Sequence, residues 1–423
     1  MLYYSTNRAS SPVDFRQATI TGQPPDKGLY FPGNIPVLPH NFIADLRNHT
    51  KESVALEVIR PYVGSSIPEE VLNRIIEQTI GFDFPLKEIE PGIFVLELFH
   101  GPTLAFKDVG AKFMSGCLEY FVSSRNRKLV VLTATSGDTG GAVANGFYGA
   151  EGIEVVILYP SGKVSAVQEM QLTRLGKNVH ALEIEGSFDH CQRMVKQAFA
   201  DAELNMLVTL TSANSINVAR WIPQQFYYFF ALQQWPHQDV APVISVPSGN
   251  FGNLCAGLLA HRSGLPVAHF IAACNANDAV PVYFQTGQYR AKPAVSTLSN
   301  AMDVGDPSNF VRLLELYGAD LEVISSFISS YSISDEETRS TIGQVFQQTG
   351  YLSDPHGAVA YAALKKHQRP GIFLETAHPV KFNDDLPMPA SLANLLQAEK
   401  QAIKMEADYE MLKGYLLTNQ FLR

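Results

Sequence analysis

Short apolar runs alternate with helical stretches along much of this 423-residue chain, and no other feature constrains the fold as strongly. The first series of runs comes at Leu129–Thr135, Ile153–Tyr159, Val179–Ile184 and Leu207–Leu210. Runs of this length, separated by helical sequence, are typical of βαβ units and of a parallel sheet. We therefore predict an α/β fold for this part of the chain.

A second series of apolar runs follows at Pro242–Val246, Val267–Ala273 and Gly371–Glu375, each beside glycine-rich or helical sequence. Because 423 residues exceed what one ordinary core holds, two α/β halves that share a cleft are the economical interpretation. The residues before both series look like an accessory segment. The tail from Pro389 has Leu and Ala at helical spacing, which predicts one or two peripheral helices.

Composition and charge argue against several classes of function. The 41 acidic side chains outnumber the 32 basic ones, so the formal net charge of -9 repels nucleic acid and anionic membranes. No apolar run approaches the roughly 20 residues of a spanning helix, and no basic leader precedes an apolar stretch at the start. The four cysteines are far apart, which argues against a disulfide framework and a zinc site. We expect a cytoplasmic protein without nucleic-acid, membrane or metal partners.

The loop after Pro242–Val246 has the composition of an anion site. Gly249 and Gly252 can adopt backbone angles that other residues avoid, so successive N–H groups can converge on a phosphate at a helix start. The alternative is a glycine-rich turn that binds nothing. The chain has neither a G-x-G-x-x-G fingerprint nor a Walker loop, so a phosphate bound here could belong to a cofactor.

Lys107 follows the apolar residues Ala105 and Phe106 and opens a stretch with helical spacing. Partial burial beside such neighbours lowers the pKa of a lysine toward the neutral amine that imine formation requires. Most lysines are solvated surface charges, so local sequence alone does not distinguish Lys107 from the others.

A second candidate anion site follows the strand that ends at Thr135. The residues after it open a helix, and the free N–H groups at a helix start suit a carboxylate. In the alternative, Ser136, Asp138 or Thr139 caps the helix and no ligand binds.

A third candidate site lies at the helix start after residue 213. Asn214, Asn217 and Arg220 are spaced three residues apart, so they can share one face and hold a phosphate dianion. Lys163, after the run Ile153–Tyr159, offers a second positive charge. The alternative places Arg220 on an ordinary helix surface and Lys163 in solvent.

The histidines do not form a catalytic or metal-binding pattern. His356 and His378 invite a general-base or ligand role, but the 11 histidines are scattered without ligand spacing. We predict that both help to structure loops, and that Asp354 caps the helix that follows Pro355.

Five segments together carry a resemblance to a known family. Their order and spacing are similar to the signature set of the threonine synthases, and with Lys27–Pro32 the match runs from about residue 20 to about residue 385. The five segments are Phe106–Asp108, Thr135–Gly140, Asn214–Arg220, Ser248–Asn253 and Glu375–Pro379.

The resemblance implies an α/β protein of the fold-type II pyridoxal-phosphate class, with the cofactor between a large parallel-sheet domain and a smaller inserted domain. We expect an N-terminal accessory segment over 1–95, the large domain over 96–125 and 215–388, the inserted domain over 126–214, and C-terminal helices over 389–423.

The resemblance also assigns roles to residues. Lys107 would hold pyridoxal 5'-phosphate as a Schiff base and remove the substrate's α-proton. Thr376 would bond the pyridine nitrogen, and its hydroxyl would leave the ring largely neutral. Many relatives have Asn where this chain has Asp138, so the contact of that Asn with the cofactor's ring oxygen stays open here. The cofactor phosphate would be held by Gly249, Asn250, Phe251, Gly252 and Asn253. The substrate would be bound by Ser136, Gly137, Asp138, Thr139, Lys163, Asn214, Asn217 and Arg220.

The implied reaction converts O-phospho-L-homoserine and water to L-threonine and phosphate by γ-elimination and β-replacement, the last step of threonine biosynthesis. A monomer or a homodimer is expected. Two alternatives stay open, namely another pyridoxal-phosphate lyase or dehydratase of hydroxy amino acids, and a pseudoenzyme that binds cofactor or phosphate without catalysis. Removing the Arg220 side chain and recording the absorbance of bound cofactor would separate them.

Overall fold

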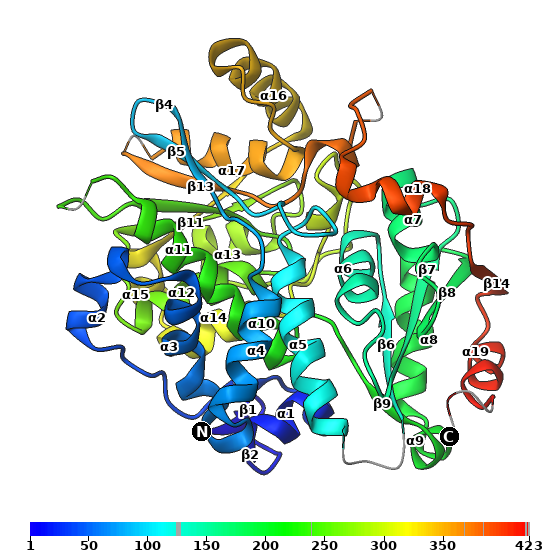
Figure 1. Cartoon of the computed structure of the whole chain (residues 1–423). Helices are drawn as coiled ribbons and strands as arrows, with labels where there is room; N and C mark the ends of the chain where they lie inside the picture. The colour runs from blue at the N-terminus through cyan, green and yellow to red at the C-terminus, as the bar shows by residue number, and fades with distance from the viewer. Residues whose placement is uncertain (124–127, 238, 368, 384, 419–420, 422–423) are drawn as a thin grey trace.

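The computed structural model describes residues 1–123, 128–237, 239–367, 369–383, 385–418 and 421. The chain forms two large sheets with helices on both faces, and a three-stranded antiparallel sheet near the N-terminus (Figure 1). The α/β prediction is therefore confirmed. No helix of the described residues is both long and apolar enough to cross a membrane.

The larger sheet has six strands, and five of them are parallel. The second series of apolar runs supplies its centre, while β4, β5 and β12 were not predicted from the sequence. In spatial order the strands are β12 (Ile328–Ser332), β11 (His269–Cys274), β10 (Val243–Pro247), β13 (Gly371–Glu375), β5 (Ile93–Glu97) and β4 (Leu86–Glu90).

Strands β4 and β5 change one expected boundary. They lie wholly or mostly within the predicted accessory segment 1–95, yet β5 pairs in parallel with β13 and β4 pairs antiparallel with β5. All five residues of β5 are buried, so this strand is part of the larger core. The larger sheet therefore begins at Leu86, inside the range expected for the accessory segment.

The smaller sheet has five parallel strands. Three of them confirm the first three apolar runs, whereas the fourth run, Leu207–Leu210, begins at the end of α9 (Ala202–Leu207) and enters a strand only at Thr209. The expected boundary between residues 125 and 126 lies outside the described residues. In spatial order the strands are β14 (Ala402–Glu406), β8 (Val179–Glu185), β7 (Ile153–Pro160), β6 (Leu129–Ala134) and β9 (Thr209–Thr211).

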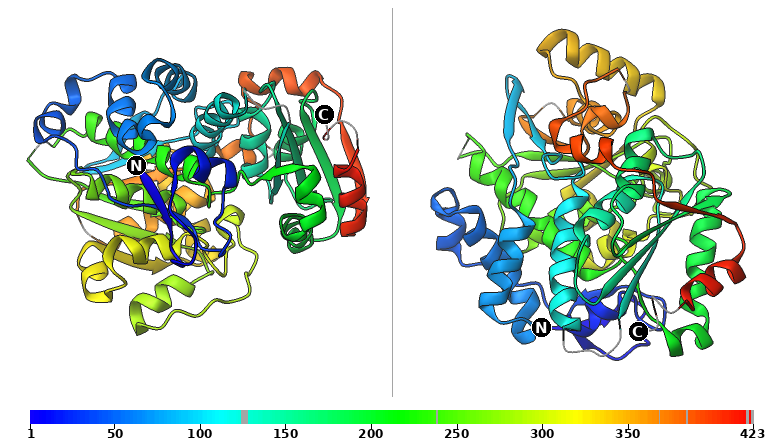
Figure 2. Two further views of the ribbon diagram at one scale, coloured as in Figure 1. Left: turned by 90° about the horizontal axis from the view of Figure 1, so that it is seen from below. Right: turned by 45° about the vertical axis from the view of Figure 1, so that its right-hand side comes forward.

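The C-terminal segment 389–423 is only partly helical. Helices α18 (Ala393–Gln397) and α19 (Tyr409–Leu416) flank β14, which adds a parallel strand at the edge of the smaller sheet. Within β14 only Met405 is buried, so the strand lacks the apolar run that marks a central strand. In Figure 2 this segment follows the outer side of the smaller unit.

Successive side chains along each central strand pack into different hydrophobic clusters, one on each face of the sheet. In β6, Val130 and Leu132 join the cluster that includes α8 (Phe188–Ala200), while Val131 faces the cluster that includes α6 (Asp138–Gly146). Successive strand residues point to opposite faces, so helices cover both sides of the sheet. The larger sheet follows the same rule, with α17 (Pro355–Lys365) on one face and α12 (Gly252–Arg262) on the other.

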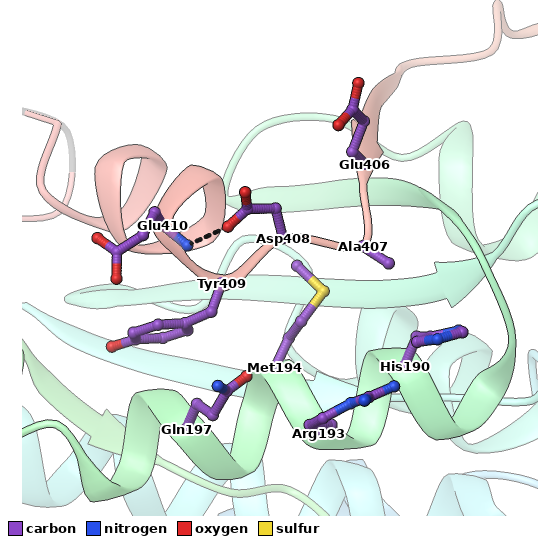
Figure 3. A pocket seen from close by; sticks show the side chains of 9 residues that line it. All are labelled: His190, Arg193, Met194, Gln197, Glu406, Ala407, Asp408, Tyr409 and Glu410. Carbon is purple, nitrogen blue, oxygen red and sulfur yellow. Dashed lines mark hydrogen bonds between the residues drawn. The ribbon is translucent and has the colours of Figure 1, made fainter.

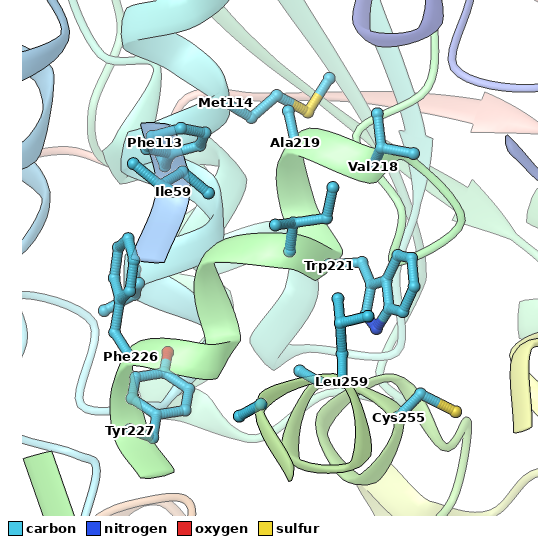
Figure 4. Packing of buried hydrophobic residues seen from close by; sticks show 14 of the residues in the cluster. Ile59, Phe113, Met114, Val218, Ala219, Trp221, Phe226, Tyr227, Cys255 and Leu259 are labelled. Atoms are coloured by element: carbon cyan, nitrogen blue, oxygen red, sulfur yellow. The ribbon is translucent and has the colours of Figure 1, made fainter. Parts of the chain in front are cut away.

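A helical core joins the segments that matter for function. In Figure 4, Met114 of α5 (Lys107–Val122) lies beside Ala219 of α10 (Val218–Trp221), and Trp221 lies next to Leu259 and Cys255 of α12. Helix α11 (Phe226–Gln234) and the 3-10 turn Ile222–Gln225 continue this packing. Helices α5 and α6 lie side by side between the two sheets (Figure 1).

The remaining elements surround these cores. The N-terminal strands are β1 (Leu2–Ser5), β2 (Val13–Asp14) and β3 (Tyr30–Pro32). The other α-helices are α1 (Phe15–Thr21), α2 (His40–Ala44), α3 (Lys51–Val63), α4 (Glu69–Thr79), α7 (Ala166–Thr173), α9 (Ala202–Leu207), α13 (Ala279–Thr286), α14 (Phe310–Tyr317), α15 (Leu321–Phe327) and α16 (Asp335–Thr349). Further 3-10 turns span Leu46–Asn48, Gly64–Ser66, Asn300–Met302, Pro379–Lys381 and Ala390–Leu392.

Candidate active site

Lys107 lies at the N-terminus of α5, beside the end of β13. The Phe106 N–H donates to the Thr376 carbonyl at 2.9 Å, and Ala105 forms an isolated bridge with Ala377. These contacts bring Lys107 and Thr376 together at the carboxyl edge of the larger sheet, where open α/β folds bind their ligands. The Thr376 hydroxyl has no hydrogen-bond partner among the described residues.

The Lys107 side chain is 16% exposed. Burial lowers the pKa of its amine, and the charges of Lys381 and Arg220 lower it further, while Asp138 and Asp354 act in the opposite direction. Charge is disfavoured in an environment poor in water, so the neutral amine becomes more accessible than in a surface lysine. This is the state that a nucleophilic lysine requires.

Asp138 lies between two lysines. Its Oδ2 is 3.7 Å from Lys107 Nζ, its Oδ1 is 2.8 Å from Lys381 Nζ, and Oδ1 also accepts from Gln168 Nε2 at 3.1 Å. Burial alone would raise the pKa of Asp138, but Lys381 and Lys107 hold it well below its usual range. Asp138 is therefore a carboxylate at neutral pH.

Sequence reasoning missed Lys381. Its side chain is fully buried, on the turn Pro379–Lys381 after β13. Val380 and Phe382 flank it with apolar side chains, the same local signal that Lys107 carries, and this signal could have suggested burial.

The loop Ser136–Thr139 leaves N–H groups free. Thr135 Oγ1 accepts from the N–H groups of Gly137 and Gly140, at 2.9 and 2.8 Å, so Thr135 rather than the three expected candidates caps α6. The N–H groups of Ser136, Asp138 and Thr139 have no partner among the described residues. Gly137 has φ 141°, which favours glycine there. The loop can therefore bind a carboxylate.

The loop Ser248–Asn253 forms a second cradle. Phe251 has φ 62° and precedes α12. Ser248 and Cys255 donate their N–H groups to protein carbonyls, and the N–H groups of residues 249–254 have no such partner in the described structure. A Cβ at Gly249 would lie 2.5 Å from Met302 Cα, and the buried Asn253 Nδ2 is unpaired among the described residues. Free amides at a helix start suit a phosphate.

Asn250 connects this cradle with the segment Asn214–Arg220. Its Nδ2 donates to Ser215 Oγ at 2.8 Å, and its Oδ1 accepts from the Ser308 N–H at 2.6 Å. Arg312 also binds the segment Asn214–Arg220, because it donates to the carbonyls of Ser215 and Ile216. The two candidate phosphate sites are therefore neighbours.

Arg220 is buried without an acidic partner. It is 3% exposed, its Nη1 donates to the Ala213 carbonyl at 2.5 Å, and its Nε has no partner among the described residues. No carboxylate of the described chain forms an ion pair with it, and burial lowers its pKa to about 10. A buried cation with an unused donor is suited to an anionic ligand.

The other candidates differ in what they can offer. Asn214 Oδ1 accepts from Thr133 Oγ1 at 2.7 Å. The buried Asn217 amide is occupied, because it donates to the Thr19 carbonyl and accepts from the Ala219 N–H as the cap of α10. Lys163 is exposed on the turn after β7, at the same sheet edge as the loop Ser136–Thr139.

The two histidines differ in position, because His356 lies in the first turn of α17 whereas His378 precedes the turn Pro379–Lys381. His356 Nδ1 lies 2.5 Å from Asp354 Oδ1, and its Nε2 accepts from the Ala301 N–H. Asp354 caps α17, which confirms that prediction. His378 caps the turn Pro379–Lys381. Among the described residues, no group of His, Cys, Asp and Glu side chains could hold a metal ion.

A surface pocket lies elsewhere on the molecule. It is formed by α8 and the segment between β14 and α19, with residues such as Arg193, Met194 and Tyr409 (Figure 3). It contains none of the candidate site residues, so it does not contribute to the arrangement around Lys107.

The residues present fit pyridoxal phosphate. Lys107 provides an amine whose pKa is lowered, the loop 249–253 provides unpaired amides for a phosphate, and Thr376 provides a free hydroxyl beside Phe106. A family model described as pyridoxal-phosphate dependent enzyme matches residues 82–375, and one described as threonine synthase N terminus matches residues 2–80. The chain belongs to the threonine synthase family.

Relatives and solved structures of this family cover nearly the whole chain. The threonine synthase of Haemophilus influenzae is 44% identical over 432 residues, which cover 99% of this chain and 100% of the relative. The crystal structure of pyridoxal-phosphate-bound threonine synthase from Brucella melitensis is 36% identical, covers 98% of both chains and has a TM-score of 0.93. That of the Escherichia coli threonine synthase is 40% identical, covers 99% of both chains and has a TM-score of 0.91.

Membership of the threonine synthase family confirms three predictions from the sequence. The fold is that of fold-type II pyridoxal-phosphate enzymes, the cofactor is pyridoxal 5'-phosphate, and the chain is a lyase of the threonine synthase family. The roles of single residues remain predictions.

Proposed function

We propose that this chain converts O-phospho-L-homoserine and water to L-threonine and phosphate, with Lys107 as the lysine that carries the cofactor. The observation that supports this substrate is Arg220, a buried guanidinium that lacks an acidic partner among the described residues. An unphosphorylated hydroxy amino acid would leave that guanidinium without an ion-pair partner, whereas a phosphate dianion would provide one.

The substrate is bound at two ends. The free N–H groups of the loop Ser136–Thr139 bind the α-carboxylate, because they converge at the start of α6. Arg220 donates to the phosphate, supported by Asn214 and by Lys163. Asn217 contributes by capping α10, which fixes the backbone that carries Arg220.

Besides Lys107, two parts of the chain would hold the cofactor. The amides of the loop Gly249–Asn253 would hold its phosphate, and the Thr376 hydroxyl would donate to its ring nitrogen. A neutral hydroxyl cannot stabilise a full positive charge on that nitrogen, so the ring stays largely neutral. When bound, pyridoxal phosphate supplies a conjugated system that accepts electron density from the substrate's α-carbon.

Lys107 transfers protons. Its neutral amine takes the α-proton, and the resulting ammonium is stabilised by Asp138 Oδ2, 3.7 Å away in the present arrangement. A β-proton is removed next, the bond between the γ-carbon and the phosphate oxygen breaks, and Arg220 stabilises the leaving phosphate dianion. A proton is then returned to the γ-carbon, which becomes the methyl group. Water adds its hydroxyl to the β-carbon and a proton returns to the α-carbon, so the products are L-threonine and phosphate.

We also propose a cytoplasmic location and a monomeric or homodimeric state. The net charge of -9 and four buried cysteines that are free thiols support a reducing compartment without anionic surfaces as partners. Size-exclusion chromatography with light scattering would test the oligomeric state.

Two measurements test the proposed function. Borohydride reduction of the holoenzyme followed by peptide mapping should place the label on Lys107. Purified protein should also release inorganic phosphate from O-phospho-L-homoserine, and Arg220→Ala should abolish most of that release. Arg60→Ala, which changes an arginine paired with Glu57 and Glu69 on the surface of α3, is the matched control.

Other outcomes would favour the alternatives. If Arg220→Ala left turnover of a plain hydroxy amino acid intact and the wild-type protein did not consume phosphohomoserine, the chain would be a different lyase of the same fold. A protein without visible cofactor absorbance and without a labelled lysine would be a pseudoenzyme.

A further inference from the structure

Lys381 is a fully buried lysine whose Nζ lies beside the proposed reaction centre. It stands after β13 of the larger sheet, yet its Nζ binds Asp138 of α6, which packs on the smaller sheet. Asp138 therefore receives one lysine from each of two segments, Lys107 at 3.7 Å and Lys381 at 2.8 Å. Burying a charged lysine is costly, so a fully buried one needs a compensating partner.

The other charged groups nearby are already engaged. Asp108 accepts from the Thr103 N–H at 2.9 Å and from its hydroxyl, while Asp354 binds His356 and the Ala377 N–H. The titratable and charged groups that act on Lys107 or Lys381 from the surrounding elements are Asp138, Arg220, Asp354, Asp108 and His378. Of the acids among these, Asp138 is the one that forms ion pairs with both lysines.

The two ion pairs are unequal in geometry. Lys381 is within hydrogen-bond distance of Oδ1, whereas Lys107 stays beyond it at 3.7 Å from Oδ2. A carboxylate without Lys381 would direct its full charge to Lys107 and favour the ammonium form of that amine. An ammonium has no free electron pair. It can therefore neither form an imine with a carbonyl carbon nor accept the α-proton.

We propose that Lys381 is a positioning residue for the reaction, because it holds the Asp138 carboxylate through Oδ1 and so keeps that carboxylate from fixing the proton on Lys107. Through the cycle Lys381 stays an ammonium and Asp138 stays a carboxylate. The transferred proton moves from the substrate's α-carbon to Lys107 Nζ and later leaves it. This inference rests on the proposed function only in that Lys107 carries the cofactor.

The proposal is tested by titrating the visible absorbance of the holoenzyme against pH, which reports protonation of the nitrogen that links Lys107 to the cofactor. Lys381→Met should raise the midpoint by about 1–3 pH units, the effect of leaving an opposite charge uncompensated nearby. Lys381→Gln keeps a hydrogen bond to Asp138 without the charge, so its midpoint should lie between those of the wild type and Lys381→Met. Asp138→Asn should lower the midpoint.

A second comparison separates positioning from simple charge repulsion. In the Asp138→Asn background, adding Lys381→Met should shift the midpoint less than it does when Asp138 is present. Lys400→Met is the matched control. Lys400, in the C-terminal segment 389–423, bridges Glu169 and Glu183 and forms no ion pair with Asp138, so its loss should leave the midpoint unchanged.

The outcomes distinguish this proposal from the proposed function. An unchanged midpoint in Lys381→Met, with the borohydride label on Lys107, would overturn the role of Lys381 and leave the proposed function standing. A label on another residue would instead refute the assignment of Lys107. If Lys381→Met does not fold, Lys381→Gln decides, because a purely structural lysine would change the melting temperature of that variant without moving its absorbance midpoint.

Discussion

Gly110 and Arg220 bring α5 and α10 into backbone contact. A Cβ at Gly110 would lie 2.6 Å from the Arg220 carbonyl oxygen and 3.2 Å from its Nε. Lys107 opens the same helix as Gly110, so this contact sets the distance between the proposed reacting amine and the proposed phosphate site. Only glycine permits that approach.

The contact predicts a strong effect of Gly110→Ala. The added methyl forces α5 and α10 apart, which should lower the free energy of unfolding by about 1–3 kcal/mol and reduce phosphate release from phosphohomoserine. Thermal unfolding and steady-state kinetics would check both. Gly343→Ala on α16 is the control, because nothing lies within 4 Å of its added Cβ and the helix should become slightly more stable. Equal behaviour of the two variants would contradict the prediction.

Arg220→Lys should behave as a damaging substitution although it conserves charge. One ammonium cannot donate to the Ala213 carbonyl and to a phosphate with the fixed geometry of a guanidinium. We expect a loss in kcat/KM of about 10- to 150-fold, which corresponds to about 1.5–3 kcal/mol for hydrogen bonds to a charged group. Inhibition by inorganic phosphate should weaken in parallel. A variant with wild-type kcat/KM would argue against contact between Arg220 and the phosphate.

Thr376→Val tests the contact proposed for the ring nitrogen. The substitution removes the hydroxyl and leaves the Thr376 carbonyl free to accept from Phe106, so the strand end should keep its structure. Loss of one neutral hydrogen bond is worth about 0.5–1.5 kcal/mol, or about 2- to 12-fold in the dissociation constant of the cofactor. Absorbance titration of the apoprotein with pyridoxal phosphate would measure it. Thr286→Val at the end of α13 serves as the control and should bind the cofactor normally.

The central strands could be predicted because burial on both faces leaves a continuous apolar run. Runs such as Leu129–Thr135 and Gly371–Glu375 carry that signal, and the loops after them contain Asp138 and Thr376. The edge strands carry no such signal. In β14 the apolar residues alternate with charged ones, and in β4 the charged residues Lys87, Glu88 and Glu90 interrupt the apolar ones, so neither has an uninterrupted run.

The missing part of the site depends on tertiary contact. Lys381 and Asp138 are 243 residues apart, and no local pattern pairs them. The cap of α6 also depends on the folded backbone, because the Thr135 hydroxyl accepts the N–H groups of Gly137 and Gly140 and the side chains of Ser136, Asp138 and Thr139 do not cap the helix. Motif order located Lys107, but the burial that lowers its pKa and the second lysine beside it follow from how the two sheets meet.

Lys107→Met should stabilise the cofactor-free protein at neutral pH. Burial lowers the pKa of Lys107 in the folded state, so between that value and the unfolded lysine value of about 10.4 the unfolded chain binds one proton more than the folded chain. Stability of the wild type therefore rises with pH across that window, and below it the folded protein bears the cost of a buried charge. The variant has no such charge. Its melting temperature should exceed that of the wild type at pH 7, and the difference should shrink as the pH approaches the unfolded value. A difference that is constant with pH would mean that packing, and not ionisation of Lys107, controls this part of the stability.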